Sequence, residues 1–551
     1  MKKKWLISSL SLALALFAIQ ALAQNVKETV QPLSKKATKG FLDDVTTDNG
    51  NINVFYKISG DKKKDELFYE KYVFDKELKF IETAAANEPK IESKPDRERK
   101  YLSAWVGGST SFDVLSMKLK VNLRNQLESW SYKRQRYVRE KTLSNETVKL
   151  KTETGHAYYG VEQFAGGKND ILVLAYYETK NKDNPRQYVW LTINFDGDVK
   201  EKNIDVPGSY SMVFCKEFNI GSDDNSNNSA SQIVVILAPN KGDLTKYVYL
   251  SYDGTGNLKN KVEFTSPASA LLVNSVDEKD GDIYLFAMSK KGTNAYNKVF
   301  EEYAPIYNPG YSSGGNNYQD DKYNRSANQS MDNFHMLKFS GNELAFATTT
   351  STDDLDKVAK FAPNEKKGKV YKGKKFGISN FEVTPAKEYL VAGQLIFKVN
   401  IGSLKDPNFV EGYGDLVCLQ FDSNGKLKAN YAVDKVFEDK KSEIFDMPQR
   451  FYISPDGKYA YWEISEVKGF SGYNSWSDAY NGRKTYRPRF FPRVTKIDLQ
   501  AATLGEFKYI GNKKFFVYRD GMIFNAATNT ITFVGRDEDH ENLWLAQLIF
   551  N

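Results

Sequence analysis

The sequence predicts an all-β fold made of one repeated hairpin, and three observations support this prediction. An alternating apolar strand, an aromatic residue and a polar tight turn followed by Leu or Val recur along the chain. More fully apolar runs lie upstream of these hairpins. The 551 residues include 37 glycines and 14% aromatic residues but only 8 methionines, which is typical of a protein with many strands and turns. A unit that recurs in this way cannot bury its apolar face alone, so the copies are expected to stack on one another.

The hairpin is recognised by its turn, which contains glycine in four copies and lacks it in a fifth, weaker one. The copies are Phe74–Lys79 (without glycine), Phe195–Lys200, Tyr252–Lys259, Phe339–Ala345 and Phe421–Lys428. Asp, Asn and Gly tolerate positive φ, so each copy predicts a tight turn between two strands. No copy has the acidic residues at alternating positions that a calcium-binding loop requires, and we therefore interpret the aspartates as turn residues.

A second kind of strand is apolar on both faces. Its five members are Asp170–Ala175, Gln232–Leu237, Asp282–Ala287, Tyr389–Ala392 and Tyr459–Trp462. Such strands belong where the sheet is covered from both sides, whereas the alternating strands are expected to be more peripheral. The predicted order is buried strand, variable loop, alternating strand, turn and last strand. This is the organisation of a single β-propeller, here of about seven four-stranded blades, with six or eight also allowed.

One segment carries a family resemblance. Residues Tyr452–Trp462 read Tyr-Ile-Ser-Pro-Asp-Gly-Lys-Tyr-Ala-Tyr-Trp, which resembles the Ser-Pro-Asp-Gly-Lys repeat of TolB-like and WD40-like β-propellers. In those proteins the turn precedes an inner apolar strand. The match covers one blade, and the other blades share only the looser pattern. Propellers of this kind bind proteins, glycans or small ligands and some carry enzymes, so the resemblance implies an architecture and little chemistry.

The C-terminal segment predicts how the ring closes. Asn542–Phe550 resembles the alternating strand before a hairpin, and the sequence stops where the turn should begin. A fourth strand is then missing from the last blade. We expect an early segment near Ile52–Tyr56 to supply this strand, because an open edge strand would otherwise stay unpaired. The runner-up fold is a pair of β-domains with residues 84–100 as the linker.

The first residues predict export. Lys2–Lys4 form a basic region, an apolar stretch follows, and Ala21–Ala23 has the small-x-small form that signal peptidase cleaves. An uncleaved membrane anchor is the alternative, but the apolar run is short and is interrupted by serines and Gln20. No later stretch has the apolar length of a membrane-spanning helix. The mature protein is therefore expected in the periplasm, outside the cell or at the cell surface.

These observations give a predicted domain organisation. Residues 1–23 are the signal peptide, residues 24–50 are a polar N-terminal arm, and residues 51–551 are the propeller. Long loop insertions are expected near residues 305–333 and 468–493.

Charge and cysteine content exclude some functions. The formal net charge of +7 falls to +4 when the three lysines of the signal peptide are removed, and 77 basic and 70 acidic residues give a mixed surface. Nucleic-acid binding would need a concentrated basic face, so it is not expected. Cys215 and Cys418 both lie in apolar runs, where buried free thiols are expected and a disulfide between them stays open.

Signals for catalysis and metal binding are sparse. His156, His335 and His540 have no metal-ligand spacing, and His335 is expected to be a partly buried, hydrogen-bonded residue. We predict no metal, no cofactor and no identifiable catalytic residue. A pair of carboxylates acting across the channel stays open, because the sequence cannot select a pair among 70 acidic residues.

The better candidates for function are the two long loops. Tyr, Trp and Arg among small polar residues are typical of surfaces that bind sugars or proteins. Both loops interrupt a blade before its alternating strand, so both would project from an end of the disc. Alternatively, their aromatic residues pack on the propeller itself. The candidate binding residues are Tyr311 in the first loop and Tyr473, Trp476, Tyr480, Arg483, Tyr486 and Arg487 in the second.

Three functions follow as hypotheses. The first is a non-enzymatic, exported binding or scaffold propeller of the cell envelope or extracellular space, with a protein or glycan partner. The second is a glycan- or peptide-acting enzyme with carboxylates at the propeller channel, which desolvated acidic residues at the channel would favour. The third is a subunit of an envelope assembly or filament, which a large exposed apolar patch would favour.

Overall fold

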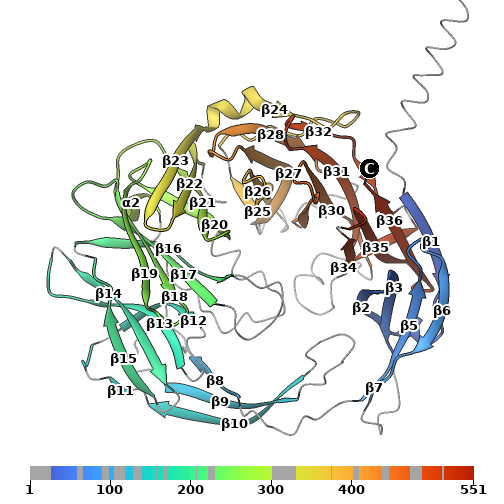
Figure 1. Cartoon of the computed structure of the whole chain (residues 1–551), viewed down its shortest axis with the longest axis horizontal. Coiled ribbons are helices and arrows are strands. Elements are labelled where there is room, and N and C mark those ends of the chain that lie inside the picture. The colour runs from blue at the N-terminus through green and yellow to red at the C-terminus, as the bar shows by residue number, and fades with distance from the viewer. Residues whose placement is uncertain are drawn as a thin grey trace, which may run out of the picture.

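The computed structural model shows antiparallel sheets arranged as a ring around a central axis (Figure 1). The structure describes residues 26–550, apart from 59–65, 90–98, 105–117, 128–138, 221–229, 301–329, 437–445, 472–486 and some shorter gaps. Four-stranded sheets recur along the chain, so the protein is an all-β propeller, as predicted. About seven blades stays a prediction, because the last two groups of strands join into one sheet through β31 and β34.

The sheets follow one another around the ring in chain order. The first consists of β2 (Phe41–Asp48), β3 (Asn51–Lys57), β5 (Tyr69–Phe74) and β6 (Phe80–Ala85), and the short pair β4 (Glu66–Leu67) and β7 (Glu88–Pro89) lies beyond it. The second consists of β8 (Arg99–Ala104), β9 (Lys118–Leu127) and β10 (Arg139–Lys149). The third consists of β12 (Tyr158–Phe164), β13 (Asp170–Glu178), β14 (Arg186–Asn194) and β15 (Asp198–Asn203), with β11 (Lys151–Thr152) added.

The second half of the ring continues this order. The fourth sheet consists of β16 (Tyr210–Ile220), β17 (Ala230–Pro239), β18 (Lys246–Asp253) and β19 (Leu258–Thr265). The fifth consists of β20 (Leu271–Lys279), β21 (Asp282–Ser289), β22 (Asn333–Ser340) and β23 (Glu343–Ser351). Next is the sheet β25 (Phe376–Val383), β26 (Tyr389–Asn400), β27 (Phe409–Phe421) and β28 (Leu427–Val433), with β24 (Ala359–Lys360) added. The last strands are β29 (Gln449–Ile453), β30 (Tyr459–Ser471), β31 (Arg487–Asp498), β32 (Thr503–Leu504), β33 (Lys508–Tyr509), β34 (Phe515–Asn525), β35 (Thr530–Asp537), β36 (Asn542–Ile549) and β1 (Val26–Pro32). Short helices are η1 (Ala37–Lys39), α2 (Tyr296–Val299) and η3 (Thr352–Val358).

The hydrophobic core is divided among the spaces between neighbouring sheets. Strand β17 shows the principle, since its successive side chains point to opposite faces. Ile233 and Val235 pack into the cluster shared with the β12–β15 sheet. Val234 and Ile236 pack into the cluster shared with the β20–β23 sheet. A strand that contributes to two cores must be apolar on both faces, which confirms this part of the sequence prediction.

The five strands that are apolar on both faces are nevertheless not the innermost ones. In each of these sheets another strand lies at the edge, next to the apolar one: β12, β16, β20, β25 and β29. Neighbours in the run β16, β20, β25 and β29 contact one another, so these first strands line the axis (Figure 1). The alternating strands are more peripheral than the apolar ones, as expected, but the lining of the axis comes from strands that the sequence pattern missed.

The N-terminus closes the ring, as predicted, but through a different segment. Strand β1 pairs with β36 in antiparallel register from Val26 opposite Leu548 to Pro32 opposite Asn542. The segment Ile52–Tyr56, expected to close the ring, instead lies in β3 of the first sheet. Residues 24–50, expected to be a polar arm, contribute both β1 and β2. Both corrections have one cause: β1 alternates half-buried and exposed residues, as an outer edge strand does, and so resembles a loop in sequence.

All five predicted hairpins are present, and three of their turns share the same hydrogen bonds. Oδ1 of Asp75, Asp253 and Asp422 accepts backbone N–H groups two and four residues further on, at 2.8–3.0 Å. The residue three positions after the aspartate has positive φ: glycine in two turns, but Leu78, at φ 63°, in the copy without glycine. The carboxylate therefore holds this turn even where the residue type is unfavourable at positive φ.

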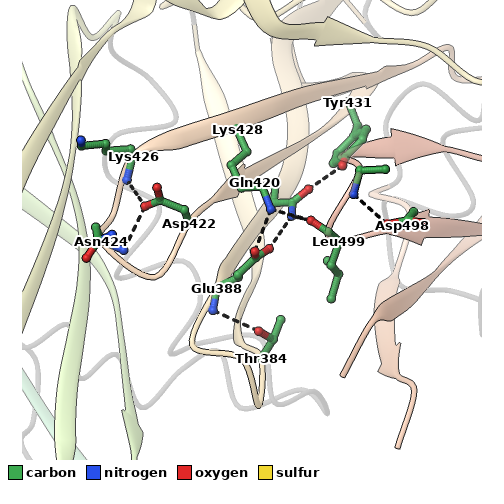
Figure 2. A network of polar contacts seen from close by, with 11 residues as sticks. Thr384, Glu388, Gln420, Asp422, Asn424, Lys426, Lys428, Tyr431, Asp498 and Leu499 are labelled. Atoms are coloured by element: carbon green, nitrogen blue, oxygen red, sulfur yellow. Dashed lines mark hydrogen bonds and ion pairs between the residues drawn. The ribbon is translucent and has the colours of Figure 1, made fainter. Parts of the chain in front are cut away.

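The turns also connect neighbouring sheets. The Gly425 carbonyl accepts a hydrogen bond from Thr348 of the preceding sheet at 2.6 Å. In Figure 2, the turn after β31 is held similarly: the Leu499 carbonyl accepts from Gln420 Nε2 at 2.7 Å and from Lys428 Nζ at 2.6 Å. Gln420 is buried, and its side-chain oxygen accepts from the Tyr431 hydroxyl at 2.6 Å. These contacts add directional polar bonds to the apolar packing between sheets.

The segment that resembles TolB-like and WD40-like repeats forms the turn between β29 and β30, ahead of an apolar strand, as expected. Ser454 Oγ donates to Asp456 at 2.6 Å and accepts the Tyr459 N–H at 3.0 Å. This bonding holds the pKa of Asp456 at about 2. The turn Thr384–Glu388 has a related pattern, since Thr384 Oγ1 accepts the Glu388 N–H at 3.0 Å. The turn chemistry is shared between two sheets, whereas membership of either family stays a prediction.

A chain that begins at Ser34 and lacks β1 is expected to melt several degrees below the chain that begins at Val26. The edge of β36 would be left open, which also favours aggregation. Thermal denaturation followed by circular dichroism measures the difference. A peptide of residues 24–33 should restore the melting temperature in proportion to its concentration, whereas a scrambled peptide should not. Equal melting temperatures for the two chains would contradict closure by β1.

Replacing Gln420 with Leu is expected to lower the free energy of unfolding by about 1–3 kcal/mol, because buried partners of its amide lose their hydrogen bonds. Urea denaturation measures the change. The matched control is Gln500→Leu at an exposed position of the adjoining turn, where a change within about 0.5 kcal/mol is expected. A Gln420→Leu protein as stable as the control would show that the connection between sheets contributes no stability.

Candidate functional site

The axial strands share an irregularity that shapes the centre of the ring. In β2, β12, β16, β20 and β25 the register with the second strand shifts by one residue at a corresponding place. The extra residues are Asp43, Val161, Val213, Asn274 and Ser379. Such a bulge bends its strand and changes the direction of neighbouring side chains. Repetition around the ring gives the axis a lining that an uninterrupted alternation would not produce.

A pocket of about 190 Å³ lies where β16, β20 and β25 meet. Two of the extra residues, Asn274 and Ser379, are part of its wall. Its polar lining residues are Lys216, Asn274, Ser275, Asp277, Ser379 and Asn380, and its apolar ones are Phe214, Val276, Ile378 and Phe381. Strand β29 supports this wall from the next sheet, since Gln449 Nε2 donates to Ser379 Oγ at 3.1 Å. The pocket therefore combines donors, acceptors and aromatic surface.

Two carboxyl groups near this pocket have raised pKa values. Burial raises the pKa of Asp277, with a contribution from the Glu278 carboxylate, while the ammonium groups of Lys216 and Lys279 act in the opposite direction. Burial also raises the pKa of Glu382 to about 7, and repulsion by the Asp277 carboxylate adds to this effect. Asp277 and Glu382 come from neighbouring sheets and influence each other across the space between them.

Glu382 is half-buried, and it differs from other acidic residues of low exposure in its hydrogen bonding. Glu463 is buried but accepts hydrogen bonds from Tyr452 at 2.9 Å and Ser465 at 2.8 Å. Glu388 accepts a hydrogen bond from Lys428 Nζ at 2.7 Å. Within the described part of the chain, no donor forms a hydrogen bond or ion pair with the Glu382 carboxylate. Because the side chain is half-buried and lacks a protein partner there, its carboxylate is accessible to a proton, water or ligand.

The binding residues predicted from the sequence lie almost entirely in the gaps of the described structure. Tyr311 lies in the 301–329 gap, and five more residues lie in the 472–486 gap: Tyr473, Trp476, Tyr480, Arg483 and Tyr486. These residues lie outside the described part of the chain. Arg487 begins β31, and its side chain is also outside what the structure describes. Their role in binding stays a prediction.

The second predicted loop is shorter than expected. Strand β30 continues to Ser471 and β31 starts at Arg487, so both ends of the predicted 468–493 insertion belong to a hairpin. Phe490 is buried, and Arg489 forms an ion pair with Glu538. Aromatic and arginine content alone suggested an exposed loop here, but cross-strand pairing with β30 places these residues within the sheet.

His335 and both cysteines are buried within the sheets. His335 is buried and hydrogen-bonded on both ring nitrogens, by Ser289 at 2.8 Å and Thr349 at 3.0 Å, as expected. Burial lowers the pKa of His335 to about 4. Cys215 and Cys418 are buried free thiols. Across the residues that the structure describes, no group of three or more His, Cys, Asp or Glu side chains is arranged to hold a metal ion.

The sequence does contain a signal for the pocket, although its pattern was not recognised. Asn274-Ser275 in β20 and Ser379-Asn380 in β25 are pairs of small polar residues flanked by apolar ones. Each pair coincides with the register shift of its strand. A pair of small polar residues between apolar ones, at the register shift of its strand, is therefore the local signal for the axial pocket.

No model of a known family matches this chain, and a search of the curated proteins finds no match. Among solved structures, the α-L-arabinanase of Penicillium chrysogenum shares 7% identity at a TM-score of 0.25, over 70% of this chain and 92% of that one. The β-propeller domain of the trilobed protease of Pyrococcus furiosus shares 7% identity at a TM-score of 0.24, over 92% of this chain and 95% of that one. Likeness of this degree assigns no family, activity or substrate.

A helix crosses a bilayer only when it is long and apolar enough. Within the described ranges, no helix combines the length and apolar character needed to cross a bilayer.

Replacing Glu382 with Gln is expected to remove part of the pH dependence of stability. The folded-state pKa of Glu382, about 7, exceeds the ordinary value of 4.5, so the folded protein holds this proton more tightly than the unfolded chain. The stabilising contribution is complete below about pH 4.5 and is lost as the pH rises through about 7. The wild-type protein should therefore lose about 1–3 kcal/mol relative to Glu382→Gln over this interval.

Urea denaturation of both proteins at several pH values measures this difference. The contributions of other titrating groups, such as His335 and Glu463, are common to both proteins and largely cancel. The exposed Glu343→Gln change is the matched control and should leave the profile unchanged. Parallel profiles for the wild-type and Glu382→Gln proteins would show that the carboxyl group is not desolvated.

Proposed function

We propose that this protein is an exported binding propeller that accommodates a hydroxyl-rich ligand, of the class of a glycan residue, in the axial pocket. The observation that carries the proposal is the pocket itself, where Lys216, Asp277 and Asn380 from three sheets converge beside aromatic rings. Pockets with a few convergent polar groups at the centre of a fold are the usual location of ligand sites.

The chemistry of the lining supports this ligand class. Asn and Ser side chains offer both donors and acceptors to the hydroxyl groups of such a ligand, Asp277 offers acceptors, and Lys216 adds a charged donor. Phe214 and Phe381 add apolar surface. At about 30 Å³ for each water, the volume of about 190 Å³ corresponds to roughly six waters, which is the scale of a single sugar ring.

Export is part of the proposal because of the predicted signal peptide over residues 1–23, with the periplasm or the cell surface as the location. The predicted aromatic loops support a wider interface with a glycan chain or a protein. Tyr473 and Trp476, for example, belong to the segment that connects β30 with β31. The assembly-subunit hypothesis receives less support, because the exposed large apolar residues of the described chain, apart from Phe397 and Phe409 on the paired strands β26 and β27, lie on strands that do not pair with one another.

A glycan-acting enzyme is the second candidate, and Glu382 is the observation that favours it. Glycoside hydrolysis requires one protonated carboxyl group to donate to the leaving oxygen and one carboxylate to activate water or attack. Glu382, with a pKa of about 7, holds a proton near neutral pH, and Asp277 lies within electrostatic range of it. Glu382 would act as the acid and Asp277 as the base or nucleophile.

An array of neutral mono- and oligosaccharides, followed by calorimetry with those that bind, tests the binding function. Lys216→Ala and Asn380→Ala should each weaken binding about tenfold or more, because each removes a hydrogen-bonding group from the pocket. The exposed turn variant Asn424→Ala is the matched control and should bind as the wild type does. An intact protein that binds none of these sugars, or pocket variants that bind them normally, would contradict the proposal.

The same sugars, analysed for cleavage products, distinguish the second candidate. Products that disappear in Glu382→Gln while binding persists would identify an enzyme. Binding without products in the wild-type protein would identify a binding module.

A further inference from the structure

The hairpin formed by β26 and β27 extends beyond the rest of its sheet. The two strands contain 12 and 13 residues, against 8 in β25 and 7 in β28. Four cross-strand pairs form the extension, from Phe397 opposite Gly412 to Asn400 opposite Phe409. No described strand pairs with the outer edge of these residues. We call residues 397–400 and 409–412 the arm.

The arm exposes two aromatic rings. Phe409 is 60% exposed and Phe397 is 37% exposed, which makes them two of the few large apolar side chains of the described chain that lie open to solvent. The ring of Phe397 lies over the backbone of β27, because a Cβ atom at Gly412 would be only 2.9 Å from its Cε2 atom. Gly412 therefore permits this ring to lie against the strand, with part of its surface open to solvent.

Two lysines flank these rings in a groove of about 420 Å³, which is lined by Lys375, Phe397, Lys398, Phe409, Val410 and Glu411. Lys375 precedes β25, and its carbonyl accepts the N–H of Ile396 at 3.1 Å, so it lies beside the base of the arm. Among the described residues, no acidic side chain forms an ion pair with Lys375 or Lys398. Glu411, the one acidic residue in the groove, is engaged in an interaction of its own.

We propose that the arm groove binds a segment of acidic polysaccharide, at a site separate from the axial pocket. The face of an aromatic ring is negative and attracts the C–H groups of a pyranose, so Phe397 and Phe409 offer stacking surfaces. Lys375 and Lys398 offer unpaired positive charge for the carboxylates of such a chain. A neutral glycan would leave both lysines without a partner, which makes charge complementarity the reason for an acidic ligand.

The groove shape favours a polysaccharide over an anionic membrane surface as the ligand. A bilayer contacts projecting side chains, whereas a chain of sugars fills a depression between side chains from several strands. Residues from β26, β27 and the segment before β25 line this depression. The membrane is therefore an outcome of the experiment and not the proposed partner.

The experiment measures binding of tetragalacturonate to the full mature chain by calorimetry, with the neutral maltotetraose for comparison. We expect tetragalacturonate to bind with an affinity that falls as salt is added, whereas any binding of maltotetraose should depend neither on salt nor on the lysines of the groove. The double variant Lys375→Gln/Lys398→Gln should lose about tenfold or more in affinity, and Phe409→Ala should lose several-fold. Because the changed side chains flank an open groove, the melting temperature should stay unchanged.

Two controls isolate the groove. Lys360→Gln removes an exposed lysine of β24 outside the groove and should bind tetragalacturonate as the wild type does. Lys216→Ala removes a charge from the axial pocket and should not abolish the part of tetragalacturonate binding that the groove variants lose, so failure of the axial proposal and failure of this one are distinguishable. Absent binding, or binding that the groove variants do not weaken, would overturn the proposal. Groove-dependent binding to phosphatidylglycerol vesicles without binding to tetragalacturonate would also overturn it, in favour of a membrane surface.

Discussion

The pairing of β1 with β36 is the constraint on which the rest of the structure depends. Sheets such as β16–β19 have apolar residues on both faces and must be covered on both sides. A ring satisfies this requirement for every sheet, but only when the last sheet is complete. Strand β1 covers the edge of β36. Leu543 and Leu545 of β36 pack against apolar residues of the first sheet. Closure therefore brings the two ends of the chain together and lets each sheet pack against a neighbour on both faces.

The ring also explains why chemistry gathers at its centre. Packing between sheets is apolar around the second strands, and the first strands are brought together at the axis. Bulges at Asn274 and Ser379 interrupt the alternation there and expose amide and hydroxyl groups to a shared pocket. The same packing removes water from Asp277 and Glu382, which raises the pKa of both carboxyl groups. A requirement of stability thus creates an unusual electrostatic environment at the candidate site.

Sequence reasoning succeeded where the signal was local. Strands such as β17 and turns such as that at Asp253 were predicted, because alternation and turn chemistry are read from adjacent residues. It missed the axial strands because a bulge shifts the alternation within a few residues. It also missed β1, which is too polar to resemble a core strand and gains its position from a partner more than 500 residues away in sequence, as the contact between Glu28 and Trp544 shows.

The sequence by itself determined that the fold is all-β, that it repeats one hairpin, and that its ends supply complementary strands of a closed ring. Each of these properties depends on residues that are near one another along the chain, or on a strand left without its partner. Only the tertiary structure decided which segment closes the ring, which strands line the axis and which acidic residue of a neighbouring sheet acts on Glu382. The physical reason is that desolvation and charge repulsion depend on distances across sheets, which no local pattern of residues specifies.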